Sequence, residues 1–339
     1  MCTSMTIKSR DGHYFFGRTL DCFPHFLDDD PRFQAQMSIF PKGTQLQGQL
    51  ETWQTKYTLG LMNIKNTIAC YDGFNEAGLA GGLNALGECT WADQAEIKAA
   101  GLSPLMGEEV ITYMLSHYKS VAEIKADFQK YALADVEFAS AVNSNIFKKI
   151  PSHYIFVDPS GDSIILEPVN HGRFKLYNSI GVMTNSPEYD WQVTNLRNYV
   201  QLQGYNAGNT QLTATTTNSN ILLNEIGYGS GLLGLPGDYT STSRFVRAAF
   251  LTRYIDEFDS QDGINVLFNT FTTVMVPKGI EHVSATSTAS DSTLYWSGYD
   301  LFEKTFYVKS AKSNTWRKNK ITDFETITHF EIPQENVFA

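Results

Sequence analysis

The first two residues, Met1 and Cys2, offer a nucleophile that needs no histidine. Removal of Met1 would leave a thiol and a free α-amine on the same residue. An α-amine has an unperturbed pKa of about 7.7–8, so part of it is unprotonated at neutral pH. This amine can take the thiol proton, directly or through water, and so produce a thiolate. The alternative interpretation is that a cysteine at position 2 is incidental to a fraying chain end.

The residues that follow Cys2 predict a β-hairpin that starts at the beginning of the chain. Residues 3–7 alternate in a strand-like pattern, residues 10–12 (Arg-Asp-Gly) are a turn signal, and residues 13–19 resume a strand pattern. A chain end that is tied into a sheet does not fray, and it holds a nucleophile rigidly. The hairpin therefore favours a functional role for Cys2.

The length of the hairpin loop decides which side chains lie beside Cys2. A three-residue loop pairs Ser4 with Arg18 and makes Arg18 a diagonal neighbour on the face of Cys2. A two-residue loop instead pairs Cys2 with Asp21 and turns Arg18 away. The pattern leaves both registers open. We expect the first register, because a cation beside the thiol favours its ionised form.

Composition limits the classes of partner and the cellular location. The chain has 339 residues, of which 42% are hydrophobic and 18% charged, and we expect one domain over residues 1–339. Its net charge of −10 argues against nucleic acid as a partner. Residues 1–20 lack the apolar core of a secretory signal, and no apolar run is long enough to span a bilayer. We therefore expect no membrane association and a cytoplasmic location.

The four cysteines do not have the spacing of a metal site. Cys2, Cys22, Cys70 and Cys89 include no Cys-x-x-Cys pair. A disulfide framework is not expected in a cytoplasmic chain of this length. We interpret the last three as buried or incidental thiols, and we expect neither a metal nor an organic cofactor.

Strand and helix signals alternate in blocks along the chain. The strand patterns cover residues 35–40, 56–61, 79–84, 154–158, 163–167, 173–177, 292–296 and 304–309. The helical patterns cover residues 104–118 with Ser103 as a cap, 121–131, 191–201, 243–258 and 263–272. This alternation predicts an α+β fold, a four-layer αββα sandwich in which two sheets pack face to face.

Four sequence blocks carry a family resemblance. They are residues 1–21, which begin Met-Cys-Thr-Ser and end Phe-Gly-Arg-Thr-Leu-Asp, 71–84 with Tyr-Asp-Gly-Phe-Asn-Glu-Ala-Gly-Leu, 181–191 with Gly-Val-Met-Thr-Asn-Ser-Pro, and 234–247 with Gly-Leu-Pro-Gly-Asp and Ser-Arg-Phe-Val-Arg. Together they resemble the cholylglycine hydrolases, the group of bile salt hydrolases and penicillin V acylases. The resemblance spans most of the chain. It implies an αββα sandwich of the N-terminal-nucleophile hydrolase type and a homotetramer.

The resemblance also implies a role for each of six residues. Cys2 matches the nucleophile, with its own α-amine as base, and Arg18 and Asp21 match residues beside the thiol and the amine. Asn185 matches a donor to the oxyanion, and Arg244 matches a second active-site arginine. Asn84 matches an asparagine of bile salt hydrolases. The residue types suit these roles, since an asparagine amide can donate to an oxyanion and an arginine favours a thiolate. Without the resemblance, each could be an ordinary turn, surface or helix residue.

The reaction implied by the resemblance is hydrolysis of a linear, non-peptide amide. The thiolate attacks the carbonyl, the amine leaves, and water cleaves the resulting thioester. The His-Tyr pair at 153–154 and the segment 191–197 favour a penicillin V acylase-type activity by a narrow margin. Asn84 and its Gly-Leu-Asn context favour conjugated bile salts, and N-acyl homoserine lactones are a third candidate. An inactive homologue that only binds acyl amides is the alternative outside the enzymes.

The acyl group of such a substrate needs an apolar pocket. We expect loops near residues 22–27, 60–66 and 130–145 to build it. The candidate substrate-binding residues are Phe23, Phe26, Leu61 and Phe138. Apolar side chains of this kind suit a phenoxyacetyl ring and a steroid face equally well, so they do not separate the two leading substrates.

Overall fold

The N-terminal hairpin forms as predicted. The computed structural model describes residues 1–22, 35–138, 149–225, 227–282 and 284–335. β1 (Cys2–Lys8) pairs with β2 (Tyr14–Cys22) around a loop at 10–12, where Gly12 has a φ of +93° that glycine adopts without strain. Ser4 pairs with Arg18. The three-residue-loop register is therefore confirmed, and Arg18 lies on the same face of the hairpin as Cys2.

The hairpin belongs to a sheet that has seven strands within the described residues. Its order is β14 (Val182–Met183), β1, β2, β18 (Ser290–Asp300), β19 (Thr305–Ser310) and β20 (Arg317–Lys320), with β17 (Glu281–His282) also paired with β18. β18 is longer than the predicted strand at 292–296, and it pairs with β2 from Cys22 to Phe15. This strand from the end of the chain thus flanks the N-terminal hairpin.

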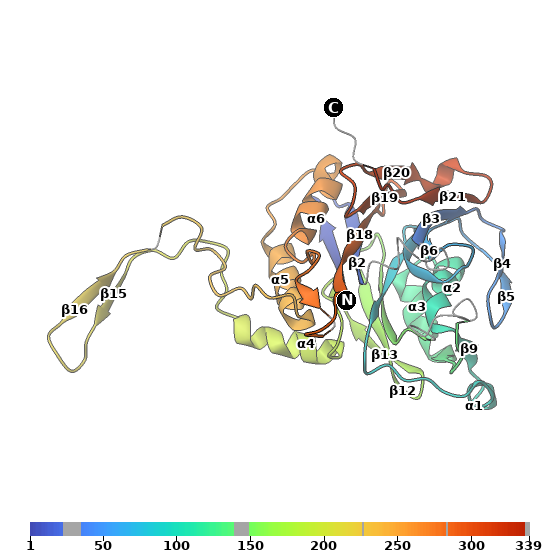
Figure 1. Ribbon diagram of the computed structural model, residues 1–339, viewed down its shortest axis with the longest axis horizontal. Coiled ribbons are helices and arrows are strands. Elements are labelled where there is room, and N and C mark those ends of the chain that lie inside the picture. Colours follow the sequence, from blue (N-terminus) through green and yellow to red (C-terminus); the bar gives the residue numbers. More distant parts are fainter. Residues whose placement is uncertain (23–34, 139–148, 226, 283, 336–339) are drawn as a thin grey trace.

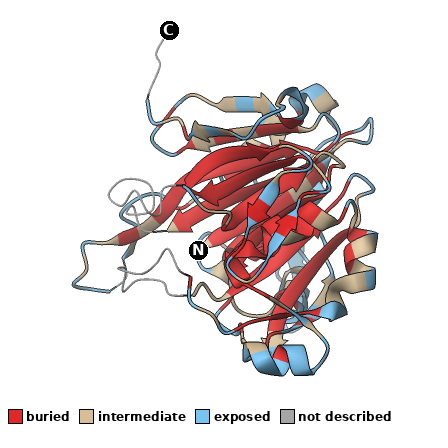
Figure 2. Cartoon of the chain, turned by 90° about the vertical axis from the view of Figure 1, so that its right-hand side faces the viewer, coloured by how far each residue is buried: buried red, intermediate tan, exposed pale blue. Residues whose placement is uncertain are grey.

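A ten-stranded sheet of described residues packs against the first. Its order is β21 (Thr328–Glu331), β3 (Ala35–Phe40), β6 (Leu59–Ile64), β7 (Cys70–Asn75), β8 (Ala80–Ala85), β11 (Ser152–Val157), β12 (Ser163–Asn170), β13 (Arg173–Asn178), β10 (Tyr131–Leu133) and β9 (Ser103–Leu105). Every residue of β3, β6, β7 and β11 is buried, as expected for strands covered on both faces (Figure 2).

Helices cover the two sheets and complete four layers (Figure 1). α5 (Ser241–Tyr254) and α6 (Gly263–Phe271) contact β1, and α6 also contacts β2 and β18, whereas α2 (Val110–His117) contacts β6, β7 and β8. The other helices described are α1 (Gln94–Ala99), α3 (Val121–Asp127) and α4 (Tyr189–Asn195), with 3-10 turns η2 (Gly107–Glu109), η3 (Phe128–Lys130), η5 (Leu196–Tyr199), η6 (Ser260–Asp262) and η7 (Ile321–Asp323). The αββα sandwich expected from the sequence is confirmed.

Side-chain caps explain where several helices begin. The side chain of Thr240 accepts a hydrogen bond from the backbone N–H of Ser243 at the start of α5, and Ser120 accepts from that of Glu123 at the start of α3. These bonds satisfy N–H groups that have no partner within the helix. The helix predicted from 243 therefore starts two residues earlier, directly after its cap.

The helix predicted over 104–118 starts later than the pattern indicates. Residues 103–105 form β9, which pairs in parallel with β10, and η2 precedes α2. Ser103 is therefore a strand residue and not a helix cap. Pairing with β10 satisfies the backbone groups that a helix would otherwise have used, so tertiary contacts override the local helical pattern.

The pocket loop expected near residues 60–66 is not a loop over most of that range, since only residues 65–66 lie in a turn. Residues 59–64 form β6 in the interior of the ten-stranded sheet, and Leu61 is fully buried there. Leu61 contributes to the hydrophobic core. The reason is its position on a strand that is covered on both faces, which leaves no side for a ligand to approach.

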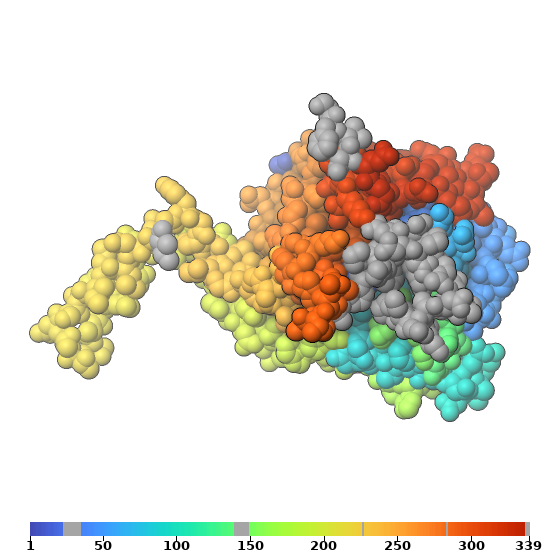
Figure 3. Space-filling model, in the orientation of Figure 1, coloured from blue at the N-terminus to red at the C-terminus, as the bar shows by residue number. Residues whose placement is uncertain are grey.

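A two-stranded arm projects from the rest of the molecule (Figures 1 and 3). It consists of β15 (Thr210–Thr213) and β16 (Asn220–Leu223), which pair with each other and with none of the other described strands. Three of its apolar side chains are more than half exposed, namely Leu212, Ile221 and Leu222. An isolated hairpin is at best marginally stable in water, so the arm lacks the packing that supports the other strands. A smaller hairpin, β4 (Gln45–Gln47) with β5 (Thr52–Gln54), lies near α2.

Two carboxylates at the start of α2 are buried. Glu108 accepts a hydrogen bond from the backbone N–H of Ile150 at 2.7 Å, and Glu109 accepts from that of Gln49 at 3.0 Å. Burial raises the pKa of Glu109 to about 7, although the hydrogen bond from Gln49 opposes the shift. Glu109 therefore holds a proton in the folded chain at pH values at which an exposed carboxyl has lost it.

Replacing Glu109 with Gln should flatten the pH dependence of stability. Its carboxyl ionises near pH 4.5 when unfolded and near pH 7 when folded, so the native state binds more protons between these values. The free energy of unfolding of the parent protein should then fall as the pH rises, by up to about 3 kcal/mol from this group. Urea unfolding at pH 5, 6, 7 and 8 measures the effect, with exposed Glu96→Gln as the control. An unchanged slope in E109Q would contradict the assignment.

Candidate active site

Cys2 lies at the start of β1, and its side chain is only 5% exposed. Its Sγ accepts a hydrogen bond from Nη2 of Arg18 at 2.9 Å. Its backbone nitrogen donates to Oδ1 of Asn185 at 2.9 Å. The hairpin and the segment after β14 therefore bring two of the expected residues into direct contact with the thiol and the nitrogen of Cys2.

Arg18 lies on β2 with its guanidinium fully buried between the two sheets. Nε donates to the carbonyl oxygen of Leu83 at 2.8 Å and to Oδ1 of Asn84 at 3.1 Å. Nη1 lies 3.4 Å from Oδ2 of Asp72. Burial would lower the pKa of Arg18, but negative charge on Cys2 and Asp72 raises it above its ordinary value. The cation beside the sulfur is therefore retained.

The close approach of the two sheets at Arg18 depends on Gly82 of β8. A Cβ at position 82 would lie 3.2 Å from Cδ of Arg18 and 3.4 Å from the ring of Phe16. Contacts of 3.2 Å are tighter than side chains normally accept, so a larger residue would displace the arginine. Gly82 thus leaves the space that the side chain of Arg18 occupies between the sheets.

Asp72 of β7 is a member of the site that the sequence analysis did not single out. Its Oδ1 accepts hydrogen bonds from the hydroxyls of Ser297, at 2.5 Å, and Tyr299, and its Oδ2 accepts from that of Tyr295 at 3.3 Å. Asp72 is fully buried. A charged residue within an otherwise buried strand was the signal that could have identified it, because buried charges need partners.

Asn84 of β8 connects Arg18 to the segment that carries Asn185. Its Oδ1 accepts a hydrogen bond from Nε of Arg18, and its Nδ2 donates to the carbonyl oxygens of Met183 and Thr184 at 3.2 and 2.8 Å. Both hydrogens of its amide are thereby engaged. Asn84 lies within the site as expected, but its contacts are those of a residue that positions its neighbours.

A buried histidine and glutamate support the same segment. Nδ1 of His153 lies 2.9 Å from Oε1 of Glu167, and its Nε2 lies 3.1 Å from the carbonyl oxygen of Thr184. Glu167 also accepts from the backbone N–H of Tyr189, at the start of α4. The pair thus ties β11 and β12 to the segment at 184–189, which includes Asn185.

Asn185 and Arg244 form a network around the main chain of Cys2. Oδ1 of Asn185 accepts from Nη2 of Arg244 as well as from Cys2, and its Nδ2 donates to the carbonyl oxygen of Ala85 at 2.9 Å. Nη1 of Arg244 donates to the carbonyl oxygen of Cys2 at 2.7 Å and to Oγ1 of Thr3 at 2.6 Å. Arg244 comes from the first turn of α5 and is fully buried, and burial lowers its pKa.

Asp21 lies beside the chain terminus through its backbone. The α-amine of Met1 donates to the carbonyl oxygen of Asp21 at 2.5 Å and lies 3.9 Å from Oδ2 of Asp291. The carboxylate of Asp21 instead accepts from the hydroxyls of Thr293 and Thr19, at 2.6 and 3.2 Å. Asp21 thus contacts Met1, the residue before Cys2, through its carbonyl oxygen, whereas its carboxylate is held by threonines.

The expected substrate-binding residues are only partly described. Phe23 and Phe26 lie outside the described residues. Phe138, at the end of a described segment, is 8% exposed and belongs to the hydrophobic core. Leu61 lies within β6, as reported above. The acyl pocket itself is therefore still a prediction.

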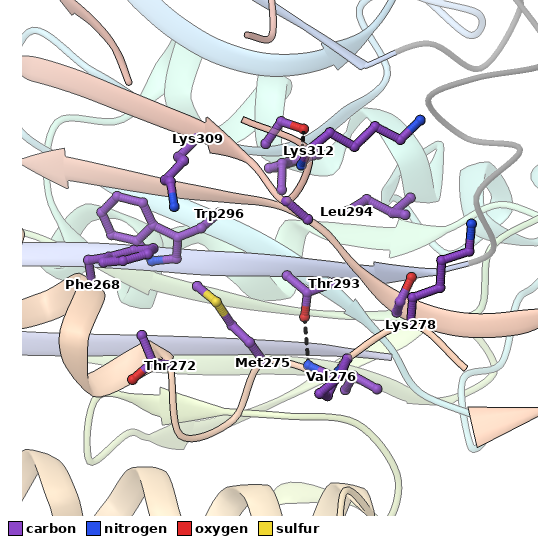
Figure 4. A pocket seen from close by; sticks show the side chains of 15 residues that line it. Phe268, Thr272, Met275, Val276, Lys278, Thr293, Leu294, Trp296, Lys309 and Lys312 are labelled. Carbon is purple, nitrogen blue, oxygen red and sulfur yellow. Dashed lines mark hydrogen bonds between the residues drawn. The ribbon is translucent and has the colours of Figure 1, made fainter. Parts of the chain in front are cut away.

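A cavity of about 480 Å³ adjoins β18 (Figure 4). Its lining includes Phe268 and Trp296 with Lys278 nearer the opposite end, and it includes none of the six expected catalytic residues. Thr293 connects this cavity to the site, since its Oγ1 accepts from the backbone N–H of Val276 and donates to Asp21. The cavity thus lies near the N-terminus, and Cys2 is not among its lining residues.

Cys2, Cys70 and Cys89 are free, buried thiols. Within the described ranges, no cluster of three or more His, Cys, Asp or Glu side chains has the arrangement of a metal site. In the same part of the chain, no helix combines the length and the apolar character needed to cross a membrane.

Comparison with known proteins agrees with this arrangement. Residues 2–326 match the family described as linear amide C-N hydrolases, choloylglycine hydrolase family. Curated relatives include the bile salt hydrolase/transferase of Clostridium perfringens, 28% identical over 93% of this chain and 90% of the relative. Another is that of Lactiplantibacillus plantarum, 30% identical over 91% of this chain and 89% of the relative.

Solved structures show the same fold. A conjugated bile acid hydrolase from Clostridium perfringens superposes with a TM-score of 0.84 at 22% identity, covering 100% of this chain and 99% of the other. The penicillin V acylase from Agrobacterium tumefaciens gives a TM-score of 0.68 at 22% identity, covering 96% of this chain and 87% of the other. With the family match over nearly the whole chain, the conclusion is that this protein belongs to the choloylglycine hydrolase family of linear amide C-N hydrolases.

Proposed function

We propose that Cys2, after removal of Met1, is the nucleophile of an amide hydrolysis that passes through a thioester. The observation that carries this proposal is the 2.9 Å contact between Sγ of Cys2 and the buried cation of Arg18. A fixed positive charge at that distance favours the thiolate over the thiol. The contact exists because the hairpin register puts the two side chains on one face.

The α-amine of Cys2 would serve as base and acid in the proposed reaction. The backbone nitrogen of Cys2 already donates a hydrogen bond to Oδ1 of Asn185, so an amine at that position is oriented before substrate binds. The amine takes the thiol proton, and the thiolate forms a bond to the amide carbon. The resulting ammonium protonates the leaving nitrogen as the C–N bond breaks, and water then cleaves the thioester with the amine again as base. With Met1 still attached, the nitrogen of Cys2 is a peptide N–H and cannot perform these steps.

Asn185 is the proposed donor to the tetrahedral oxyanion. One hydrogen of its Nδ2 is donated to Ala85, which leaves the second for an oxyanion beside Cys2. The amide is held on its oxygen side by Arg244 and Cys2, so little reorganisation is needed when charge develops. Arg244 and Asn84 are proposed to position these groups, and Asp21 is proposed to place the terminus through its carbonyl oxygen.

Conjugated bile salts are the substrate class that we place first. The curated relatives cited above are bile salt hydrolase/transferases at 28 and 30% identity. These relatives reverse the ranking of substrates suggested by the sequence, in which penicillin V stood narrowly ahead of conjugated bile salts. Penicillin V stays the second candidate because of the His-Tyr pair at 153–154, and His153 does lie beside the segment that carries Asn185.

The exposed arm supports a proposal that the protein is a homo-oligomer. Leu212, Ile221 and Leu222 are 53, 61 and 61% exposed on a hairpin that no other described strand covers. Leu212 and Ile221 are cross-strand partners on one face, whereas Leu222 lies on the other, and exposed apolar side chains of this kind favour burial against another surface. We propose a second copy of this chain as the occupant, in the tetramer that the family resemblance implies.

Removing the thiol should abolish turnover. Cys2→Ala is expected to keep the fold and lose hydrolysis of amides, whereas Cys2→Ser should be much slower than the parent because an alcohol ionises less readily than a thiol. Intact mass confirms loss of Met1, and peptide mapping after brief iodoacetamide treatment should show Cys2 labelled before Cys70 and Cys89. Near-normal turnover by C2A would refute the proposed nucleophile.

Competing substrates test the substrate class directly. With glycocholate, taurocholate, penicillin V and an N-acyl homoserine lactone, we expect the largest kcat/KM for a bile salt conjugate. Faster cleavage of penicillin V would restore the order suggested by the sequence. Cleavage of none by a correctly processed, Cys2-reactive protein would favour a different acyl amide.

Polar substitution of the arm should change the assembly and leave the fold intact. The triple variant Leu212→Ser, Ile221→Ser, Leu222→Ser is expected to shift the molar mass measured by light scattering towards that of a monomer. Ile327→Ser, an exposed apolar residue away from the arm, is the matched control. If the arm variant kept the molar mass of the parent, the arm would not be the interface.

A further inference from the structure

We propose that Asp72 is a positioning residue that holds the Arg18 guanidinium against the sulfur of Cys2 and stays its counterion while that sulfur carries no charge. The inference deepens the proposed function and rests on it, since it concerns the same thiolate. It assigns a role to a buried carboxylate that was not among the expected site residues.

The contacts of Arg18 show why one anion is needed in addition to the thiolate. Nε is committed to two neutral acceptors, the carbonyl oxygen of Leu83 and the amide oxygen of Asn84. Nη2 faces the sulfur, and Nη1 faces Oδ2 of Asp72. Asp72 is thus the carboxylate in contact with this guanidinium among the described residues. It also fixes the rotation of the guanidinium plane, because it binds the nitrogen opposite the one that faces Cys2.

Asp72 is itself held in place by one strand. Tyr295, Ser297 and Tyr299 alternate along β18, so their side chains share the inner face of the sheet, and each donates a hydroxyl hydrogen to the carboxylate. Ser297 is also the partner of Arg18 in the ladder between β18 and β2. Burial raises the pKa of Asp72, and Arg18 together with the hydroxyl donors opposes the shift. A carboxyl group that only accepts hydrogen bonds is favoured in its ionised form.

The charge on Cys2 changes during the proposed reaction, whereas that on Arg18 does not. The thiolate forms a carbon–sulfur bond, the C–N bond of the substrate breaks, and the electron pair leaves with the protonated amine. The thioester sulfur is then neutral, and water restores the thiol later. A fully buried guanidinium without an anion in this interval would be strongly destabilising. Asp72 keeps Arg18 paired throughout, so the cation is in place when the thiolate forms again.

The pH dependence of Cys2 alkylation distinguishes positioning from simple charge. In the processed enzyme, the rate of iodoacetamide labelling at Cys2, resolved by peptide mapping, defines a pH midpoint. If Asp72 positions Arg18, Asp72→Asn releases the guanidinium and the midpoint should rise by about 1 unit or more, with kcat falling at least tenfold. If Asp72 acts only as a nearby negative charge, its removal should lower the midpoint. A lowered or unchanged midpoint overturns the proposal.

A double-mutant cycle checks that Asp72 changes the pH midpoint of Cys2 labelling through Arg18. In an Arg18→Gln background, Asp72→Asn should produce no further rise of the midpoint, because the group that it positions is absent. An equal rise in both backgrounds would overturn the proposal. Asp158→Asn, which removes another buried carboxylate that binds the backbone N–H of Val121, is the matched control and should leave the midpoint unchanged.

A milder variant covers the case in which D72N does not fold. Ser297→Ala with Tyr299→Phe removes the donors to Oδ1 and keeps the charge, so the midpoint should rise in the same direction by a smaller amount. No rise in this folded variant overturns the proposal. Failure of the proposed function is recognised separately, as a Cys2→Ala protein that still turns over substrate.

Discussion

A buried cation between two sheets is the constraint on which the rest of this structure depends. Arg18 has no access to water, so each nitrogen of its guanidinium needs an acceptor from the protein. Those acceptors come from β7, β8 and the first residue of β1. Removing one partner of a buried ion pair typically costs about 3–5 kcal/mol of folding stability. The packing of the two sheets therefore depends on the same side chains that surround Cys2.

The same constraint explains why the supporting residues are mostly amides, hydroxyls and main-chain carbonyls. Asn84 and Asn185 each present an oxygen to an arginine, and each amide nitrogen is bound to a carbonyl oxygen of the main chain. Neutral partners satisfy hydrogen bonds without adding further charge to an interior of low dielectric constant. Cys2 is therefore surrounded mainly by fixed dipoles, together with the charges of Arg18, Arg244 and the buried carboxylates Asp72 and Asp21.

Sequence reasoning located the hairpin and the family residues but not the contacts among them. Cys2 and Arg18 were placed together by strand periodicity, which is a local property, once the loop length was known. Asp72 was not singled out, because its partners on β18 are more than 200 residues away and no local pattern records such pairing. For the same reason the sequence indicated a pocket loop near residues 60–66, most of which belongs to β6, and a helix cap at Ser103, which lies in β9. The roles of Phe23 and Phe26 stay predictions, since both lie outside the described residues.

Because β18 lies beside β2, the surroundings of Cys2 are completed late in the synthesis of the chain. Cys2 is among the first residues to leave the ribosome, whereas the strand that holds Asp72 and flanks Arg18 is among the last. A nascent chain therefore carries Cys2 and Arg18 without the flanking strand β18 for most of translation, because pairing between distant strands forms late. The buried surroundings of the Cys2 thiol are therefore complete only after the strands from the end of this sequence have docked.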